Sequence, residues 1–223
     1  MAPALKRLLL HSALLVTLVA LRCRPALLAA ISCPYAFSRL KLITLTLSLE
    51  TEHLLDEYMA FQGLSGVPSN VPDYTVRGSN FSEQLQDIYA RNVLFKLHIK
   101  KVTEYQIEDW GNPINVAEPL NQVAYSLFSQ TNMLVLLTQR LYPEVALTTV
   151  EPPHLSHNHS WPKKSYGWNV IVGLKYWLAE VNKVLQAAQE LCDNHVDEAP
   201  GGSRTLGGQA PKSNSRRKLY QSR

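Results

Sequence analysis

The stretch that decides the fold is residues 161–191, WPKKSYGWNVIVGLKYWLAEVNKVLQAAQEL. Its apolar residues recur at steps of three or four, the spacing that places side chains on one face of an α-helix. Such a helix is stable only when other elements cover its apolar face. The stretch therefore predicts one helix of a helical bundle. The residues expected on its buried face are Val170, Leu174, Leu178, Val181, Leu185 and Ala188.

Three earlier stretches repeat this periodicity, so the sequence predicts four long helices. They lie at about residues 37–62, 81–107, 119–142 and 162–191. Gly63 suits a left-handed C-cap after the first helix, and Asn80 followed by Glu83 suits an N-cap for the second. Pro119 suits the first turn of the third helix. The apolar face expected in the first helix carries Leu40, Ile43, Leu47, Leu54, Tyr58 and Phe61.

The links between these helices are long, short and long. A helix of about 26 residues is about 39 Å long, and a link of about ten residues does not comfortably span that distance. The second and third helices are therefore expected to be antiparallel. The other two links are long enough to run along the bundle. The sequence predicts an all-α, long-chain four-helix bundle with up-up-down-down topology, over residues 33–192.

The basic charge of the chain lies at its two ends. The formal net charge is +4, yet residues 1–32 contain four basic residues and no acidic one, and residues 193–223 contain six basic and three acidic ones. The part between them is mildly acidic, so nucleic acid is not an expected partner. Residues 193–223 lack periodicity and are rich in Gly, Ser, Pro and Arg, which predicts a disordered tail.

Residues 1–32 have the pattern of an export signal. Lys6 and Arg7 precede an apolar run over residues 8–21, which is shorter than the roughly 20 residues needed to cross a membrane. We expect a signal peptide that is removed before Cys33, so that the protein is secreted, extracellular and without stable membrane insertion. A retained membrane anchor is the alternative.

If the protein is exported, two glycosylation acceptor triplets and two cysteines can be modified. Asn80 and Asn158 each begin an Asn-x-Ser triplet and are candidate glycosylation sites. Cys33 and Cys192 would be the only cysteines left in the mature chain. The predicted topology brings the start of the first helix and the end of the fourth to the same end of the bundle. The two cysteines could therefore form a disulfide, and two unpaired cysteines near frayed ends are the alternative.

Two motifs carry a family resemblance. Residues 57–63, EYMAFQG, end the first predicted helix and lead into a proline-rich loop. Residues 161–164, WPKK, begin the last helix, with Gly167 three residues on and Trp177 further along. In these features, and over about residues 37–191, the chain resembles the ciliary neurotrophic factor, cardiotrophin and cardiotrophin-like cytokine branch of the interleukin-6 family.

The resemblance implies a secreted neurotrophic cytokine and growth factor that binds glycoprotein 130 and the leukemia inhibitory factor receptor and activates JAK-STAT signalling. It implies that Trp161, in place of the family phenylalanine, and Lys164 contact the second of these receptors. The alternative is that Trp161 only packs under the preceding loop. Family members that use an alpha receptor carry an arginine and an aspartate where this chain has Glu180 and Val184. An alpha receptor is therefore left open as a partner.

Other function classes fit the sequence less well. The sequence has no spaced nucleophile and base, paired carboxylates or phosphate-binding loop, so we expect neither an enzyme nor a cofactor. We expect no metal site at His154, His157 and His159, because a loop offers no fourth ligand at fixed geometry. The alternative function is a secreted amphipathic helical lipid-binding protein. Its polar faces would be lined with Lys and Arg, whereas these helices carry mostly Gln, Asn, Ser and Thr.

Overall fold

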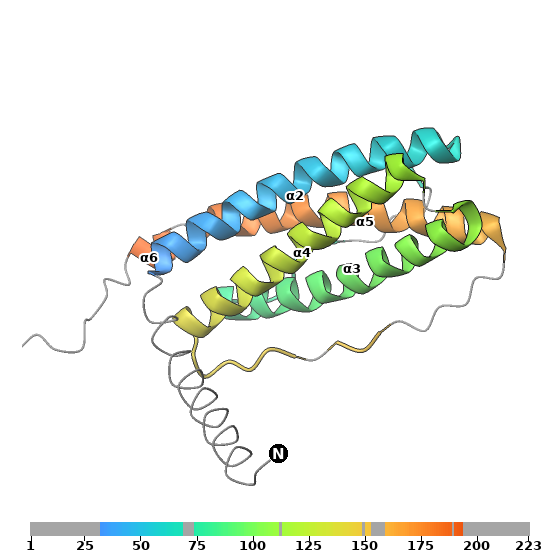
Figure 1. Ribbon diagram of the computed structural model, residues 1–223. Helices are drawn as coiled ribbons and strands as arrows, with labels where there is room; N and C mark the ends of the chain where they lie inside the picture. The colour runs from blue at the N-terminus through green and yellow to red at the C-terminus, as the bar shows by residue number, and fades with distance from the viewer. Residues whose placement is uncertain are drawn as a thin grey trace, which may run out of the picture.

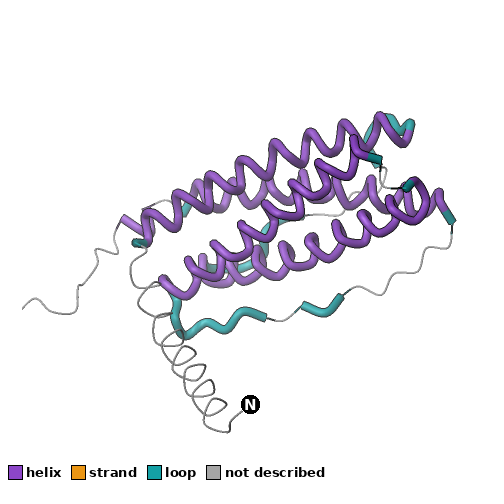
Figure 2. Tube along the Cα trace, viewed as in Figure 1, coloured by secondary structure: helices purple, strands orange, loops and turns teal. Residues whose placement is uncertain are grey.

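The computed structural model describes residues 32–68, 74–111, 113–148, 150–152, 159–188 and 190–193. Within these ranges the protein is helical and contains no strands (Figure 2). The elements are α2 (Cys33–Gln62), α3 (Phe81–Trp110), α4 (Ile114–Leu141), α5 (Ser160–Ala187) and the short α6 (Glu190–Asp193) (Figure 1). The predicted signal segment, the candidate sequon at Asn158, His154, His157 and the predicted tail beyond Asp193 lie outside the described residues.

The four long helices pack against one another around a single apolar core. Helix α2 packs against α4 and α5, and α3 packs against the same two helices. Leucines seven residues apart on α2 are fully buried, as the helical periodicity predicts. Burying one such side chain contributes about 1.5–3 kcal/mol. Among the largest fully buried side chains are Leu40, Leu47, Leu54, Leu85, Ile88, Ile99, Leu120, Leu127, Leu134, Leu137 and Trp177.

Contacts between helix ends show which ends lie together. Near the start of α2, the ring of Phe37 lies 6.3 Å from that of Phe81 at the start of α3. At the other end of both helices, Gln62 Nε2 donates a hydrogen bond to Gln106 Oε1 at 3.3 Å. The starts of α2 and α3 are therefore neighbours, and so are their ends.

A buried chain of hydrogen bonds connects all four long helices. Trp177 Nε1 on α5 donates to Asn92 Oδ1 on α3 at 2.8 Å, and Asn92 Nδ2 donates to Gln130 Oε1 on α4 at 2.8 Å. Gln130 Nε2 then donates to Thr44 Oγ1 on α2 at 2.7 Å. All four side chains are fully buried. Because each hydrogen bond needs both partners in place, this chain of hydrogen bonds favours one arrangement of the helices, both sideways and along their axes.

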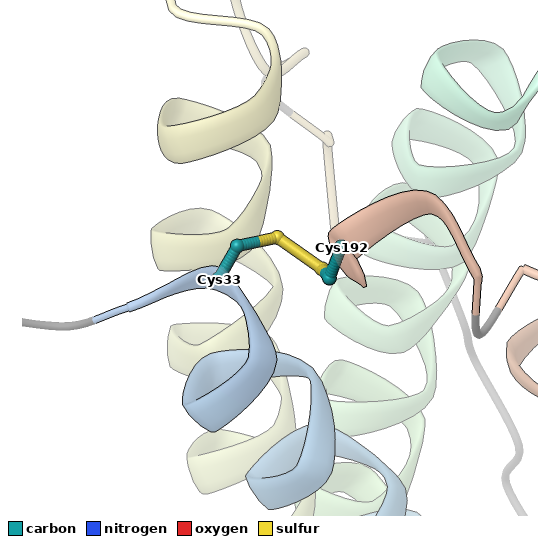
Figure 3. The surroundings of a disulfide bond; sticks show 2 residues. All are labelled: Cys33 and Cys192. Atoms are coloured by element: carbon teal, nitrogen blue, oxygen red, sulfur yellow. A yellow bond between two sulfur atoms is a disulfide. The ribbon is translucent and has the colours of Figure 1, made fainter. Parts of the chain in front are cut away.

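The first and last parts of the bundle are joined by a disulfide. Cys33 at the start of α2 pairs with Cys192 in α6, with a Cα–Cα distance of 5.4 Å (Figure 3). Both cysteines are almost fully buried. The pairing, one of the two alternatives for these residues, is thus present in the structure. None of the described helices combines the length and the apolar character needed to cross a membrane.

Two helix boundaries differ from the prediction in a way that shortens the link between the second and third helices. Helix α4 begins at Ile114 and contains Pro119, instead of starting there. Proline is tolerated because it lies only one turn and a half from the start, where few intrahelical bonds are lost. Helix α3 continues to Trp110, and Gly111 caps it in the left-handed conformation at φ 68°. The link between α3 and α4 is therefore only residues 111–113.

The other boundaries differ by a few residues. Helix α2 begins at Cys33 and ends, as predicted, before Gly63, which is left-handed at φ 61°. Helix α5 ends at Ala187, and α6 follows as a separate turn. Phe61, predicted to face the core, is exposed, because Tyr58 and Gln62, four residues apart, occupy the buried face at this end of α2.

Candidate functional site

The candidate contact residues lie together at the start of α5. Trp161 is 67% exposed, so the described residues do not cover its ring. Lys164 Nζ lies 5.6 Å from the centroid of that ring, within the range of a cation–π interaction. Trp161 and Lys164, together called the α5 box here, thus present a large aromatic surface and a positive charge side by side. Aromatic and charged side chains of this kind are typical anchors of protein interfaces.

The neighbouring lysine has a different environment. Lys163 Nζ donates hydrogen bonds to Asp109 Oδ1 at 2.6 Å and to Glu108 Oε2 at 3.0 Å. Its ammonium also lies 5.2 Å from the centroid of the Tyr105 ring. The Lys163 side chain is only 12% exposed. Lys163 therefore anchors the start of α5 to the end of α3, whereas the half-buried Lys164 has its ammonium group over the Trp161 ring.

The ion pair shifts the pKa of both partners. The hydrogen bond from Lys163 lowers the pKa of Asp109. The same bond, together with the one to Glu108, raises the pKa of Lys163. Both shifts favour the charged forms, so the anchor is present throughout the neutral range.

A second anchor comes from α2. The Tyr58 hydroxyl donates a hydrogen bond to the Lys164 carbonyl oxygen at 3.1 Å, across 106 positions in the chain. Gln106 Nε2 lies 3.5 Å from the same hydroxyl and donates to it. Tyr58 is fully buried, and burial raises the pKa of its hydroxyl, so the group stays protonated and remains a donor.

An aromatic cluster continues the contact between α5 and α3. Tyr166 on α5 hydrogen-bonds His98 Nδ1 through its hydroxyl at 2.5 Å. Its ring also lies 5.9 Å from that of Tyr105 in an edge-on arrangement. Burial lowers the pKa of His98 and raises that of Tyr166. The cluster holds the inner side of α5 against α3 just beyond the α5 box.

The other candidate residues are spread over the molecule. Asn80 is exposed at the start of α3, where its Oδ1 accepts the Glu83 backbone N–H at 2.9 Å as an N-cap. The α5 box lies near the opposite end of α3, about 45 Å away along a helix of 30 residues. A glycan on Asn80 would therefore leave the α5 box accessible. The described part of the chain contains no group of three His, Cys, Asp or Glu side chains arranged to hold a metal ion.

Glu180 and Val184 lie further along α5. Glu180 Oε1 accepts a hydrogen bond from Lys183 Nζ at 2.5 Å, which partly neutralises its charge. Val184 is partly buried and packs against the core. These two positions therefore do not offer a basic and an acidic side chain side by side on this part of α5.

Two exposed apolar sets are not among the residues that the sequence predicts for a binding site. Leucines form a stripe on the outer side of α2, and two aromatic side chains project from α4. Steps of three and four residues also connect the leucines, which is the signal that could have revealed a second stripe beside the buried one. The residues are Leu42, Leu45 and Leu49 on α2, and Tyr125 and Phe128 on α4.

Comparison with known proteins identifies no family for this chain, since no protein-family model, curated protein or solved structure matches it. The chemistry of its surface is then the basis for a function. Exposed aromatic, apolar and ammonium groups bind a partner surface without making or breaking bonds. The α5 box and the two exposed apolar sets are therefore suited to recognition of another macromolecule.

Proposed function

We propose that this protein is a secreted cytokine that binds glycoprotein 130 and the leukemia inhibitory factor receptor. Joining the two receptor chains would bring their cytoplasmic kinases together and activate JAK-STAT signalling. The observation that carries the proposal is the exposure of Trp161 beside Lys164 at the start of α5. These are the two residues to which the family resemblance gives the receptor contact.

The proposed bundle has the up-up-down-down topology of long-chain cytokines. Support comes from three neighbouring pairs of helix ends. Phe37 and Phe81 join the starts of α2 and α3, and the disulfide joins the start of α2 to α6. Lys163 joins the start of α5 to the end of α3. With α2 and α3 running in one direction, α5 then runs in the other.

The α5 box would act as an interface hot spot. A tryptophan ring that enters a receptor pocket buries a large apolar area, and the adjacent ammonium group adds a charge that favours one orientation. Lys163 and Tyr58 hold the backbone that carries both groups, so little conformational freedom is lost on binding. The receptor contact would thus draw its affinity from few residues on a rigid support.

A second receptor chain needs a separate surface. The family uses exposed faces of its first and third helices for glycoprotein 130. The leucine stripe of α2 and the exposed aromatic side chains of α4 are the candidate anchors here. Glu180 is paired with Lys183 and Val184 is partly buried, so we expect signalling without an alpha receptor.

The leucine stripe also suits the alternative, a lipid-binding protein, because apolar side chains along a helix can enter a lipid surface. Flotation with phosphatidylcholine vesicles separates the two functions. A cytokine should remain unbound at low protein concentration, whereas saturable association with vesicles that is lost on Leu45→Glu plus Leu49→Glu would favour lipid binding.

The direct test is surface plasmon resonance with the immobilised ectodomain of the leukemia inhibitory factor receptor. Trp161→Ala plus Lys164→Ala should weaken binding by about 30-fold or more, equivalent to about 2 kcal/mol. Lys175→Ala plus Tyr176→Ala is the matched control, because it also removes a lysine and an exposed aromatic residue from α5. Equal binding by the box variant and wild type would refute the proposed contact.

A further inference from the structure

Gly167 of α5 and Tyr58 of α2 approach each other too closely for any other residue at position 167. A Cβ atom added at Gly167 would lie 2.7 Å from Tyr58 Cζ and closer still to the hydroxyl oxygen. Non-bonded carbon atoms attract best at about 3.5–4.0 Å, so an added methyl group would have to displace the ring. The absence of a side chain at Gly167 is what allows Tyr58 to reach the α5 backbone.

Tyr58 has no room to move away. Its side chain is fully buried and its hydroxyl accepts a hydrogen bond from Gln106 while donating to the Lys164 carbonyl oxygen. Gln106 in turn accepts a hydrogen bond from Gln62. The position of Tyr58 is therefore fixed by α2 and α3, and α5 must adjust to it.

The start of α5 depends on such tertiary contacts. His159 occupies the N-cap position but makes no capping hydrogen bond with its side chain. The first backbone N–H groups of a helix have no intrahelical acceptor, so an uncapped start tends to fray. Lys163 holds this segment to α3 and Tyr58 holds it to α2.

We infer that the contact between Tyr58 and Gly167 positions the α5 box for its receptor. The inference rests on the proposed function, and both residues are positioning residues that do not themselves touch the receptor. Tyr58 sets the depth at which α5 lies on α2, and its hydroxyl holds the carbonyl group of Lys164 itself. The contact also gives a physical reason for the two motifs to occur together, because Tyr58 lies in one and Gly167 follows the other.

The same helix offers a matched control. A Cβ atom added at Gly173 would lie 2.7 Å from Tyr74 Cζ, the same distance as at Gly167. Tyr74, however, lies in a loop and is only partly buried, so its ring can move. Gly173→Ala thus introduces an equal clash that the loop relieves, whereas Gly167→Ala has to shift α5.

Two measurements test the inference: binding to the leukemia inhibitory factor receptor ectodomain, and hydrogen exchange of the backbone amides of residues 160–168. Gly167→Ala should bind about tenfold more weakly or worse and exchange about tenfold faster in this segment. Gly173→Ala should bind within about twofold of wild type. Tyr58→Leu in the Gly167→Ala background should recover about threefold of the lost affinity, because leucine leaves room for the added methyl group.

Several results would overturn the inference. Equal losses of affinity for Gly167→Ala and Gly173→Ala would assign both glycines a purely structural role. Wild-type binding by Gly167→Ala, with binding lost in the Trp161→Ala plus Lys164→Ala variant, would refute the positioning and leave the proposed function intact. If neither wild type nor variants bind, the proposed function fails, and unchanged exchange in residues 160–168 would refute the positioning as well. Should Gly167→Ala fail to fold, Tyr58→Phe replaces it, because this change adds no atoms and removes only the hydroxyl that holds the Lys164 carbonyl group. The same two measurements apply, and unchanged binding with unchanged exchange would refute the positioning.

Discussion

Cys33 and Cys192 are 159 positions apart in the chain and are joined by a disulfide, with their Cα atoms 5.4 Å apart. The bond connects the first residue of α2 to α6 and so closes a loop that contains all four long helices (Figure 3). A cross-link of this span restricts the unfolded chain strongly, so its effect should be on stability. The α5 box lies at the other end of α5 and should be unaffected.

Removing the disulfide should therefore destabilise the protein without abolishing recognition. Cys33→Ser plus Cys192→Ser should lower the free energy of unfolding by about 2–5 kcal/mol. Urea unfolding followed by circular dichroism measures this change, with Ser38→Ala, at an exposed position of α2, as the control. If the variant unfolds at the same urea concentration as oxidised wild type, and reducing wild type does not change its midpoint, the bond contributes nothing to stability.

The buried hydrogen-bond chain makes Asn92 critical. Asn92→Ala leaves the Trp177 indole N–H and the Gln130 side-chain oxygen without partners inside the core. Each buried polar group left unpaired costs about 1–3 kcal/mol, so we expect a loss of about 2–4 kcal/mol in urea unfolding. Asn121→Ala, at an exposed position of α4, should change stability by less than about 0.5 kcal/mol. Similar losses of stability in both variants would contradict a special role for the buried hydrogen-bond chain.

His98 should make stability depend on pH. Burial lowers its pKa in the folded protein, so the unfolded chain binds a proton more readily. The contribution of neutral, buried His98 to stability is then complete above the unfolded pKa of about 6.5. It falls as the pH falls from there toward the folded pKa. The free energy of unfolding of wild type should decrease more between pH 7.5 and about pH 5 than that of His98→Gln.

Chemical denaturation at a series of pH values measures this difference. His53→Gln, a change at an exposed histidine of α2, is the control for loss of an imidazole group. Parallel curves for wild type and His98→Gln would show that the burial of His98 does not oppose its protonation.

Asn80 combines a cap with a candidate glycosylation site. Asn80→Asp removes the acceptor amide but keeps an oxygen that can accept the Glu83 N–H, whereas Asn80→Ala removes both. In unglycosylated protein, Asn80→Ala should lose about 1 kcal/mol relative to Asn80→Asp. In protein from mammalian cells, both changes should remove the mass of one glycan. An unaltered mass would show that Asn80 is not occupied.

The helices were predictable because their periodicity is independent of partners. Leu40, Leu47 and Leu54 are spaced for one helical face and are all buried. The start of α4 was mispredicted because Pro119 suits a first turn, and only the structure shows that the Pro113 carbonyl oxygen accepts the first bonds of the helix, from the N–H groups of Val116 and Ala117.

Polar contacts between distant segments were not predictable. Asn92 and Gln130 resemble residues of solvated faces in the sequence, and only their pairing makes burial favourable. For the α5 box, the sequence singled out Trp161 and Lys164, but it did not reveal that the adjacent Lys163 binds Asp109, since that partner is 54 positions away. The same holds for Tyr58 and Gly167, whose contact depends on how α2 and α5 pack.

The most direct test of the proposed function is STAT phosphorylation in cells that carry glycoprotein 130 and the leukemia inhibitory factor receptor but no alpha receptor. Wild type should give a dose-dependent signal. Trp161→Ala plus Lys164→Ala, folded by circular dichroism, should lose it, while the control Lys175→Ala plus Tyr176→Ala should retain it. A full signal from the box variant, or none from wild type with any combination of these receptors, would contradict the proposal that the α5 box recruits a signalling receptor.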